Sequence, residues 1–342
     1  MRILYCGSLY MGSTCRMRKN IFEEFGYEVI PLDRDSYYGM GGRYLSAIFR
    51  RLQWGPNFSE LHRGLVSKAD TYKPDIIWVD KGILIGPETL RLIKKMLPKT
   101  LMVHYAGDPL IKYHRSRSFL NSIPLYDILF TTKDYELIDY ERLGARNLKL
   151  IGMAYSKNDH RPINLTEKDI EQFGNDISFI GHSEPWYVEQ LSPLLELNVR
   201  FAVWGPGWRK VKIFRKAFRG DGIYGEDYAK AICASKISIG LLSKKAPDDI
   251  TTRSLEIPAC GTFLLAQRTQ KHLQYFREGE EVEFFDGKEE LLEKCRYYLA
   301  HEEKRKLIAD AGRQACLTSG YSYHDRIREM MEIIDKYYQN EF

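Results

Sequence analysis

Short apolar segments that suit buried strands alternate along this 342-residue chain with amphipathic segments that suit helices. A first series begins at residues 2–7 (RILYCG) and ends at residues 147–153, and a second begins at residues 176–181 (DISFIG) and ends at residues 282–285. Because helices between successive strands bring the strands together in parallel, each series predicts a parallel sheet covered on both faces. The sequence therefore predicts an α/β fold with two Rossmann-like domains.

A polar stretch, residues 154–176, separates the two series and contains no apolar run of strand length. We place the domain boundary inside it, so the predicted domains are residues 1–160 and residues 161–322. Farther on, apolar side chains recur between residues 323 and 338 at the i, i+3, i+4, i+7 spacing of one helix face. We expect this C-terminal helix, within residues 323–342, to pack back on the first domain.

The composition fits a globular protein, with 44% hydrophobic and 28% charged residues. A formal net charge of +5 favours a phosphate-bearing ligand but lacks the excess of a dedicated nucleic-acid-binding protein, so no nucleic-acid partner is expected. The six cysteines form no C-x-x-C pair and no zinc-type spacing with histidine. With neither a signal-like N-terminus nor an apolar run long enough to span a bilayer, the sequence predicts a cytoplasmic protein.

The segment 241–266 (LLSKKAPDDITTRSLEIPACGTFLLA) predicts a strand end, a polar loop, a short helix and the next strand. Unpartnered backbone N–H groups at the start of such a helix lie at the positive end of its dipole and bind diphosphates well. Pro258 should keep the helix short. The alternative is an ordinary surface turn with a solvated arginine. The predicted donor contacts in this segment are Lys244, Thr251, Thr252 and Arg253.

Within this segment, the run R-S-L-E-I-P-A-C-G-T-F-L-L at 253–265 resembles the signature of the CgeB-like glycosyltransferases, which have a group-1-type C-terminal glycosyltransferase domain. The resemblance covers roughly the second half of the chain. It implies a GT-B fold, in which a cleft separates two Rossmann-like domains. It also implies a metal-independent enzyme, a hexosyltransferase, that moves a sugar from a nucleotide-diphosphate donor to an acceptor hydroxyl, with a UDP-sugar favoured.

Two acids in the same segment resemble the E-x7-E motif of the related retaining GT-B enzymes. Asp248 and Glu256 have this spacing, as D-x7-E. The resemblance assigns Glu256 to the donor ribose and Asp248 to the neighbourhood of the sugar. The shorter aspartate departs from the motif, which leaves the donor sugar and the stereochemical course open.

Two strand ends in the second domain complete the predicted donor site. The resemblance implies that Gly181 allows close approach of the donor and that His182 contacts its phosphate or sugar. It places Trp204 and Gly205 where GT-B enzymes hold the nucleobase. The alternatives are an ordinary surface histidine and a tryptophan that packs in the core.

In the first domain, the segment HYAGDP at 104–109 ends the fourth predicted strand, and ligands bind at such strand ends. Asp108 is the candidate catalytic base, since a desolvated carboxylate can accept the proton of an acceptor hydroxyl. His104 is assigned to the same cleft-facing segment. The alternative for Asp108 is a carboxylate that caps the turn before Pro109.

The loop GSLYMGST at 7–14 has the G-x4-G spacing of a P-loop, but Ser13 replaces the lysine that the nucleotide requires. An NTPase is therefore disfavoured. We expect Gly12, Ser13 and Thr14 to cap the first helix and to lie beside the sugar or the acceptor. Asp33-Arg34-Asp35 matches a metal-binding D-x-D but follows a strand of a Rossmann-like unit, which is the wrong context, so no metal ligand is predicted.

Residues 208–219 (WRKVKIFRKAFR) carry six basic residues, with Val211, Phe214 and Phe218 at helical spacing. The segment predicts either a solvated basic face or a peripheral contact with anionic lipid on the inner membrane face. The acceptor is left open among glycan, lipid-linked, small-molecule and protein classes. Two other functions stay open for the same fold: a non-catalytic protein that binds nucleotide-sugars or polyanions, and a sugar-nucleotide epimerase.

Overall fold

Two sets of parallel strands correspond to the two predicted series. The computed structural model describes residues 1–37, 56–113 and 116–341. It contains two compact units, one made of Met1–Gly152 with Arg326–Phe342 and the other of Met153–Asp325. The chain enters the second unit at Met153 rather than at the predicted residue 161, because Met153 and Tyr155 pack in a core of that unit.

The first sheet has six parallel strands in the order β2-β1-β3-β4-β5-β6. Every residue of β3 and β4 is buried, which is the pattern of strands covered on both faces. The strands are β1 (Arg2–Gly7), β2 (Glu28–Asp33), β3 (Ile76–Asp80), β4 (Leu101–Ala106), β5 (Ile128–Thr131) and β6 (Leu148–Leu150).

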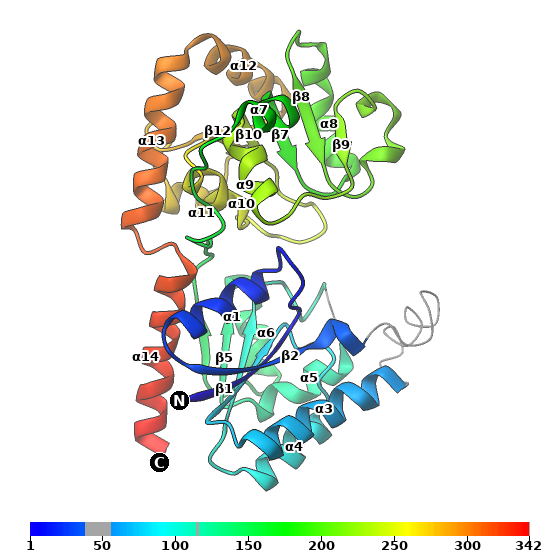
Figure 1. Cartoon of the computed structure of the whole chain (residues 1–342), viewed down its shortest axis with the longest axis vertical. Coiled ribbons are helices and arrows are strands. Elements are labelled where there is room, and N and C mark those ends of the chain that lie inside the picture. The colour runs from blue at the N-terminus through cyan, green and yellow to red at the C-terminus, as the bar shows by residue number, and fades with distance from the viewer. Residues whose placement is uncertain (38–55, 114–115, 342) are drawn as a thin grey trace. The chain divides into compact units, whose positions relative to one another are not determined.

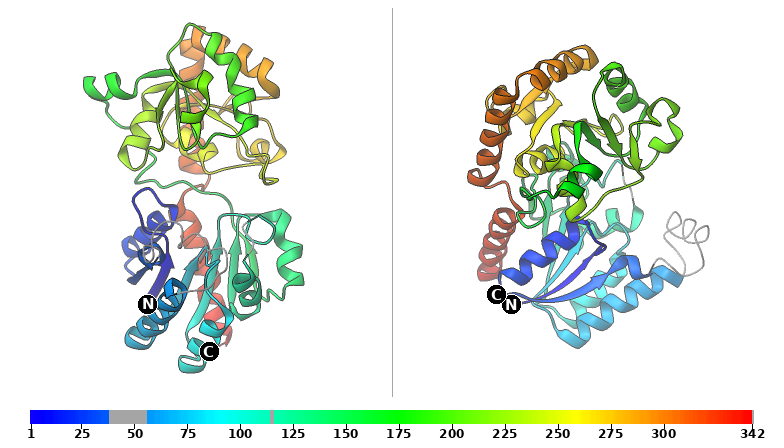
Figure 2. Two further views of the ribbon diagram at one scale, coloured as in Figure 1. Left: turned by 90° about the vertical axis from the view of Figure 1, so that its right-hand side faces the viewer. Right: turned by 45° about the horizontal axis from the view of Figure 1, so that its top comes forward.

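Helices cover both faces of this sheet (Figures 1 and 2). Leu4 and Cys6 point to the core under α3, α4 and α5, whereas Tyr5 points to the other face and meets Phe22 of α1. The helices of this unit are α1 (Thr14–Glu24), α3 (Pro56–Tyr72), α4 (Pro87–Met96), α5 (Arg117–Ser122), α6 (Leu137–Arg142) and α14 (Tyr323–Glu341).

The C-terminal helix α14 belongs to the first unit from Arg326 onward. Its predicted apolar face is buried at Ile327, Met330 and Ile334. The expectation that it packs back on the first unit is confirmed. Of the helices that the structure describes, none combines the length and the apolar character needed to cross a bilayer.

The second sheet also has six parallel strands, in the order β12-β11-β10-β7-β8-β9. Residues of α8 and α12 pack on one face and residues of α9 and α10 on the other. The strands are β7 (Asn175–Ile180), β8 (Phe201–Trp204), β9 (Phe218–Gly220), β10 (Ser235–Gly240), β11 (Phe263–Gln267) and β12 (Glu283–Phe285). The helices are α7 (Glu167–Phe173), α8 (Pro185–Leu191), α9 (Glu226–Cys233), α10 (Arg253–Ala259), α11 (Gln270–Tyr275), α12 (Gly287–Ala300) and α13 (Glu302–Thr318). Each unit is Rossmann-like, as predicted.

One local expectation is wrong, and one helix was not predicted. Residues 208–219 form two 3-10 turns followed by the start of β9, not a helix, because the rings of Trp208 and Phe214 turn inward and pack 4.8 Å apart. The stretch 154–176 contains the helix α7, which begins with a capping box between Thr166 and Asp169.

Candidate functional site

The second sheet reverses its strand order between β7 and β10. β8 and β9 lie on one side of this point, and β11 and β12 lie on the other. In open parallel sheets, ligands bind at the carboxyl ends of the strands that flank such a switch point. Here these ends continue into residues 181–184 after β7 and residues 241–252 after β10. The two segments contain the predicted site residues Gly181, His182, Lys244, Asp248, Thr251 and Thr252.

Glu184 joins the two segments across the switch point. Its Oε1 atom lies 2.6 Å from His182 Nε2 and accepts a hydrogen bond of 2.6 Å from the Ser243 hydroxyl. Burial of Glu184 disfavours its charged form, but these hydrogen bonds and the nearby Lys245 hold its pKa below the ordinary value. The sequence analysis missed Glu184, although its position two residues after His182 at a strand end was a usable signal.

Tyr187, on α8, brings further predicted residues to the same place. Burial raises its pKa to about 12; the charge of Arg253 opposes this rise, while Glu184 and Asp248 add to it. The charges of Arg253, Asp248 and Glu184 therefore all lie within electrostatic range of this phenol. Three segments, 184–187, 243–248 and the start of α10, therefore converge.

The turns that follow β7 and β8 contact each other through glycines. A Cβ atom on Gly205, whose φ is +134°, would lie 2.1 Å from the carbonyl oxygen of Gly181, so no side chain fits there. The indole Nε1 of Trp208 donates a hydrogen bond of 2.7 Å to the same oxygen. The predicted donor residues Gly181 and Gly205 are therefore brought together.

Trp204 does not present its ring to a ligand as predicted, and another tryptophan, Trp186, contacts a predicted site residue. Trp204 is buried and packs with Phe173, Ala202 and Ala231, so its ring has no face free for a nucleobase and the packing alternative holds. Trp186, which the sequence analysis did not select, carries the Lys244 ammonium 4.6 Å from its ring centroid.

The start of α10 offers unused hydrogen-bond donors. Among the described residues, no acceptor is found for the backbone N–H groups of Thr252 and Arg253. The Nε group of Arg253 is also buried without a partner in the described part of the chain. Such donors at a helix start suit an anionic ligand. The predicted short helix is confirmed, with Pro258 inside its seven residues.

His272 fixes the start of α10 to the neighbouring strand. Its Nδ1 donates to the Gln267 carbonyl oxygen at 2.7 Å, so its Nε2 accepts from the Ser254 hydroxyl at 2.7 Å. Burial lowers the pKa of His272 to about 4, which keeps the ring neutral in this arrangement. The sequence analysis missed this Ser254–His272 pair because the partners are eighteen residues apart.

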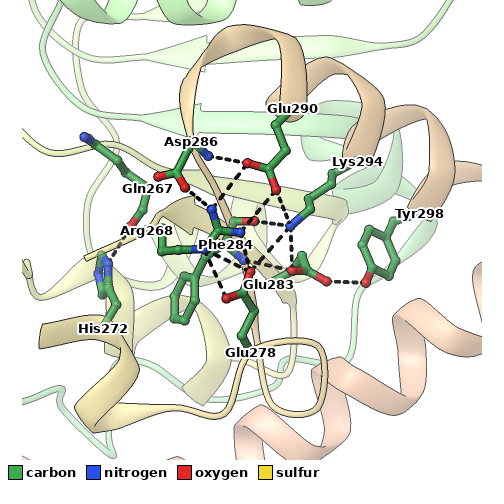
Figure 3. A network of polar contacts seen from close by, with 10 residues as sticks. All are labelled: Gln267, Arg268, His272, Glu278, Glu283, Phe284, Asp286, Glu290, Lys294 and Tyr298. Carbon is green, nitrogen blue, oxygen red and sulfur yellow. Dashed lines mark hydrogen bonds and ion pairs between the residues drawn. The ribbon is translucent and has the colours of Figure 1, made fainter. Parts of the chain in front are cut away.

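A network of ion pairs supports the same end of the sheet (Figure 3). Arg268, just after β11, binds Glu278, Asp286 and Glu290, and Lys294 of α12 lies 2.8 Å from Glu290. Burial opposes ionisation of Glu290, but Arg268 and Lys294 lower its pKa to about 2. Because Gln267 precedes Arg268, the network and the His272 contact both hold the end of β11.

Glu256 is buried on α10 and faces α9. The Tyr228 hydroxyl donates to its Oε2 at 2.5 Å, and His160 Nε2 lies 3.9 Å from its Oε1. The Ser156 amide donates to His160 Nδ1 at 3.1 Å, which leaves the proton of the neutral ring on Nε2, toward Glu256. The sequence analysis missed Tyr228 and His160 as neighbours of this carboxylate.

The first sheet has its own switch point, between β1 and β3, and an internal ion pair occupies it. Arg18 of α1 binds Asp80 through two hydrogen bonds, of 2.8 and 2.9 Å, and both side chains are buried. Burial opposes ionisation of Asp80, but Arg18 and the Tyr5 hydroxyl lower its pKa. The guanidinium also lies 4.4 Å from the ring centroid of Tyr105.

Asp108 follows β4, and its carboxylate forms an ion pair with Lys81, the residue after β3. Its side chain is 47% exposed. His104 is different: it is fully buried between Phe119 and Tyr126, and burial lowers its pKa to about 3. Its assignment to a ligand-facing segment is wrong, because its position in β4 points it into the core.

Ser13 is the N-cap of α1: it accepts a hydrogen bond from the Cys15 amide at 3.2 Å and follows Gly12, whose φ is +83°. The predicted capping by this loop is confirmed at Ser13, and a ligand contact of Gly12, Ser13 and Thr14 stays a prediction. Within the described residues, no group of three or more His, Cys, Asp and Glu side chains is arranged to hold a metal ion. Asp33 accepts instead from the Leu9 amide at 3.1 Å.

Residues 185–332 match the family model described as glycosyl transferase-like. This part of the chain is therefore similar to glycosyl transferase-like domains. It contains β8 to β12 and the α10 segment, and it begins one residue after Glu184. The sequence matches none of the curated proteins with which it was compared.

Solved structures resemble the whole chain. HepE of Anabaena in complex with UDP-glucose has a TM-score of 0.68 at 13% identity, covering 98% of this chain and 100% of its own. Sucrose-phosphate synthase from Thermosynechococcus elongatus has a TM-score of 0.70 at 10% identity over the full length of both chains. A putative UDP-N-acetylglucosamine 2-epimerase from Listeria monocytogenes has a TM-score of 0.61 at 12% identity, covering 100% of this chain and 97% of its own. These likenesses establish the predicted GT-B fold.

Proposed function

We propose that the protein is a glycosyltransferase that moves a sugar, of the hexose class, from a nucleotide-diphosphate donor to an acceptor hydroxyl. The observation that carries this proposal is the set of unused donors at the β7–β10 switch point, inside the glycosyl transferase-like domain. These are the N–H groups at the start of α10 and the Arg253 guanidinium. The CgeB-like subtype is part of the proposal and rests on the run at 253–265.

The chemistry of the leaving group assigns roles to these donors. As the sugar departs, negative charge develops on the diphosphate, and fixed hydrogen-bond donors stabilise it without reorganising. Arg253 supplies a planar pair of donors, and Lys244 and the N–H groups supply further positive potential. This arrangement does the work of a divalent cation, so we propose that transfer is metal-independent.

Glu256 is proposed to hold the donor ribose. One of its oxygens already accepts from Tyr228, so a ribose hydroxyl would donate to Oε1, which lies 3.9 Å from His160 Nε2. His182, oriented by Glu184, is proposed to contact the phosphate or sugar, and Asp248 to lie beside the sugar. The complex of HepE with UDP-glucose supports a UDP-sugar as the donor.

Asp108 is proposed as the base toward the acceptor if the reaction inverts configuration. Lys81 keeps this carboxylate paired, and the base is free to accept a proton only after that pair opens. If the reaction retains configuration, the departing phosphate takes the proton and Asp108 orients the acceptor. The order of these events depends on the acceptor, whose class the proposal leaves open.

A screen of UDP-, GDP-, TDP- and CMP-sugars tests the proposal by thermal stabilisation and by slow donor hydrolysis. We expect one base to stabilise the intact protein, and Glu256→Ala to lose most of this stabilisation. Glu293→Ala, an exposed glutamate of α12 in the same unit, is the matched control and should behave as the intact protein does. Binding of no donor at millimolar concentration would overturn the donor-site assignment.

The likeness to the putative 2-epimerase favours a second candidate, a sugar-nucleotide epimerase. An epimerase returns an altered nucleotide-sugar without an acceptor, whereas a transferase releases the nucleoside diphosphate. Product analysis by anion-exchange chromatography separates the two. A third candidate, a non-catalytic nucleotide-sugar-binding protein, predicts donor binding that neither consumes nor alters the donor.

A further inference from the structure

The positive charge of the chain is concentrated in one segment of the second unit. Residues 208–221, which we name the basic lobe, contain six of the 51 Lys and Arg residues and one of the 46 Asp and Glu residues. The rest of the chain therefore holds 45 residues of each sign, and the lobe carries the whole formal net charge of +5. Its cations are Arg209, Lys210, Lys212, Arg215, Lys216 and Arg219.

All six cations of the basic lobe are exposed. Arg209 pairs with Asp221 at 2.8 Å, and among the described residues no carboxylate lies within ion-pair distance of the other five. Like charges without counter-charges repel one another, which opposes the compact state. The lobe is therefore electrostatically complementary to an anionic partner outside the chain.

The apolar residues of the basic lobe divide into two groups. Trp208, Phe214 and Ala217 are buried and hold the lobe on the unit, whereas Ile213 is 57% exposed next to Lys212. An exposed aliphatic side chain within a basic segment suits the interface of an anionic bilayer, where it enters the headgroup layer while the cations meet lipid phosphates.

A nucleic-acid partner fits the basic lobe less well. Single strands bind by stacking bases on exposed aromatic rings. Here Trp208 and Phe214 face the core, and the Arg209 guanidinium lies 5.6 Å from the ring centroid of the half-buried Phe218. The rings of the lobe are thus used inside the unit.

Protection of a sheet edge does not account for the basic lobe either. β9 is an edge strand, and charges on edge strands prevent pairing between molecules. Only Arg219 lies in β9, however, and the other five cations lie in the turns before it, between β8 and β9 (Figure 1).

We propose that the basic lobe docks the protein on the surface of an anionic lipid bilayer, with Ile213 in the headgroup layer. This inference goes beyond the proposed function and does not depend on it. Each cation near an anionic leaflet changes partitioning about fivefold, so removal of three should weaken binding about a hundredfold. The attraction should decline with salt, since the Debye length is about 10 Å at 0.1 M ionic strength.

Sedimentation of the full chain with lipid vesicles tests the proposal. We expect binding to vesicles that mix phosphatidylglycerol with phosphatidylcholine, and none to phosphatidylcholine alone. The variant K212Q/R215Q/K216Q should bind about a hundredfold more weakly. The control R296Q/K304Q/K306Q removes three exposed cations of α12 and α13 and should bind as the intact protein does. I213S should also weaken binding to anionic vesicles, but severalfold less than the triple variant K212Q/R215Q/K216Q does.

Circular dichroism establishes that each variant is folded before its binding is compared. Three results would overturn the proposal: no binding to anionic vesicles at low salt, equal loss in the two triple variants, or equal binding to both kinds of vesicle. Tighter binding of labelled DNA than of anionic vesicles would assign the lobe to a nucleic acid instead. Because donor binding is not measured, failure here leaves the proposed function standing.

Discussion

The carboxyl edges of the two sheets differ, although both sheets have six parallel strands and a switch point. At the first edge, Arg18 neutralises Asp80 within the unit, and both are buried. At the second, Glu184 anchors His182 and Ser243, while Arg253 Nε finds no acceptor among the described residues. Side chains of the unit pair with one another at the first edge, whereas the second edge keeps hydrogen-bond donors available for a ligand. This contrast supports the proposal that the anionic nucleotide-sugar binds to the second unit.

The largest effect should follow from breaking the pair that completes the first edge. Asp80→Asn leaves the Arg18 charge buried without a counter-charge, and loss of one partner of a buried pair costs about 3–5 kcal/mol. Urea unfolding should show this loss in the transition of the first unit. Asp70→Asn breaks the exposed pair with Lys73 and should cost less than about 1 kcal/mol. Equal losses in the two variants would show that the first edge does not depend on its internal pair.

A smaller effect is expected from weakening the polar centre of the second edge. Glu184→Gln removes the charge that holds His182 and Ser243, and hydrogen bonds to charged groups contribute about 1.5–3 kcal/mol each, part of which the amide retains. We expect a loss of about 1–2 kcal/mol in unfolding free energy and weaker donor binding. Glu189→Gln, exposed on α8, which begins just after Glu184, is the control. Unchanged donor binding in Glu184→Gln would remove His182 from the site.

The smallest effect, taken per pH unit, comes from two buried histidines, one in each unit. Burial lowers the pKa of His104 to about 3 and that of His272 to about 4, so the folded protein does not bind these protons between pH 6.5 and those values. The unfolded chain does bind them, so stability is full above pH 6.5 and declines as the pH falls. Each histidine contributes up to about 1.4 kcal/mol per pH unit.

Unfolding free energies measured at about pH 7, 6 and 5 follow this loss of stability. His272→Gln should flatten the slope of the second unit above pH 4 and leave that of the first unit unchanged. Asp80 contributes to stability in a different pH range. Because its pKa is lowered in the folded unit, its contribution is fully present above pH 3.8, the ordinary pKa of an aspartate, and is lost only as the pH falls below that value. A slope unaffected by His272→Gln would mean that this ring accepts a proton in the folded unit.

The sheets were predictable because strand runs such as 76–79 are apolar throughout, which is the pattern of a strand covered on both faces. The short α10 followed from Pro258. The spacing of Val211, Phe214 and Phe218 wrongly suggested a helix, since 3-10 turns ending in an edge strand pack the same three positions against the core.

The site residues were predictable only where they lie together in one continuous segment of the sequence. Arg253 and the N–H groups of α10 come from a single run, whereas Glu184, Tyr228 and His272 reach it from other elements. Burial of His104 and Trp204 depends on residues far away in sequence, such as Phe119 and Ala231, and strand-end position alone does not reveal it.

Calorimetric titration with the nucleoside diphosphates UDP, GDP and TDP tests the central claim most directly. For the one that binds best, we predict that Arg253→Ala weakens the affinity about tenfold to a hundredfold, the equivalent of a lost charge-assisted hydrogen bond. Asp108→Asn, at the first edge, should leave the affinity unchanged. Equal affinity of Arg253→Ala and the intact protein, or loss of binding in Asp108→Asn alone, would contradict the assignment of the donor to the second unit.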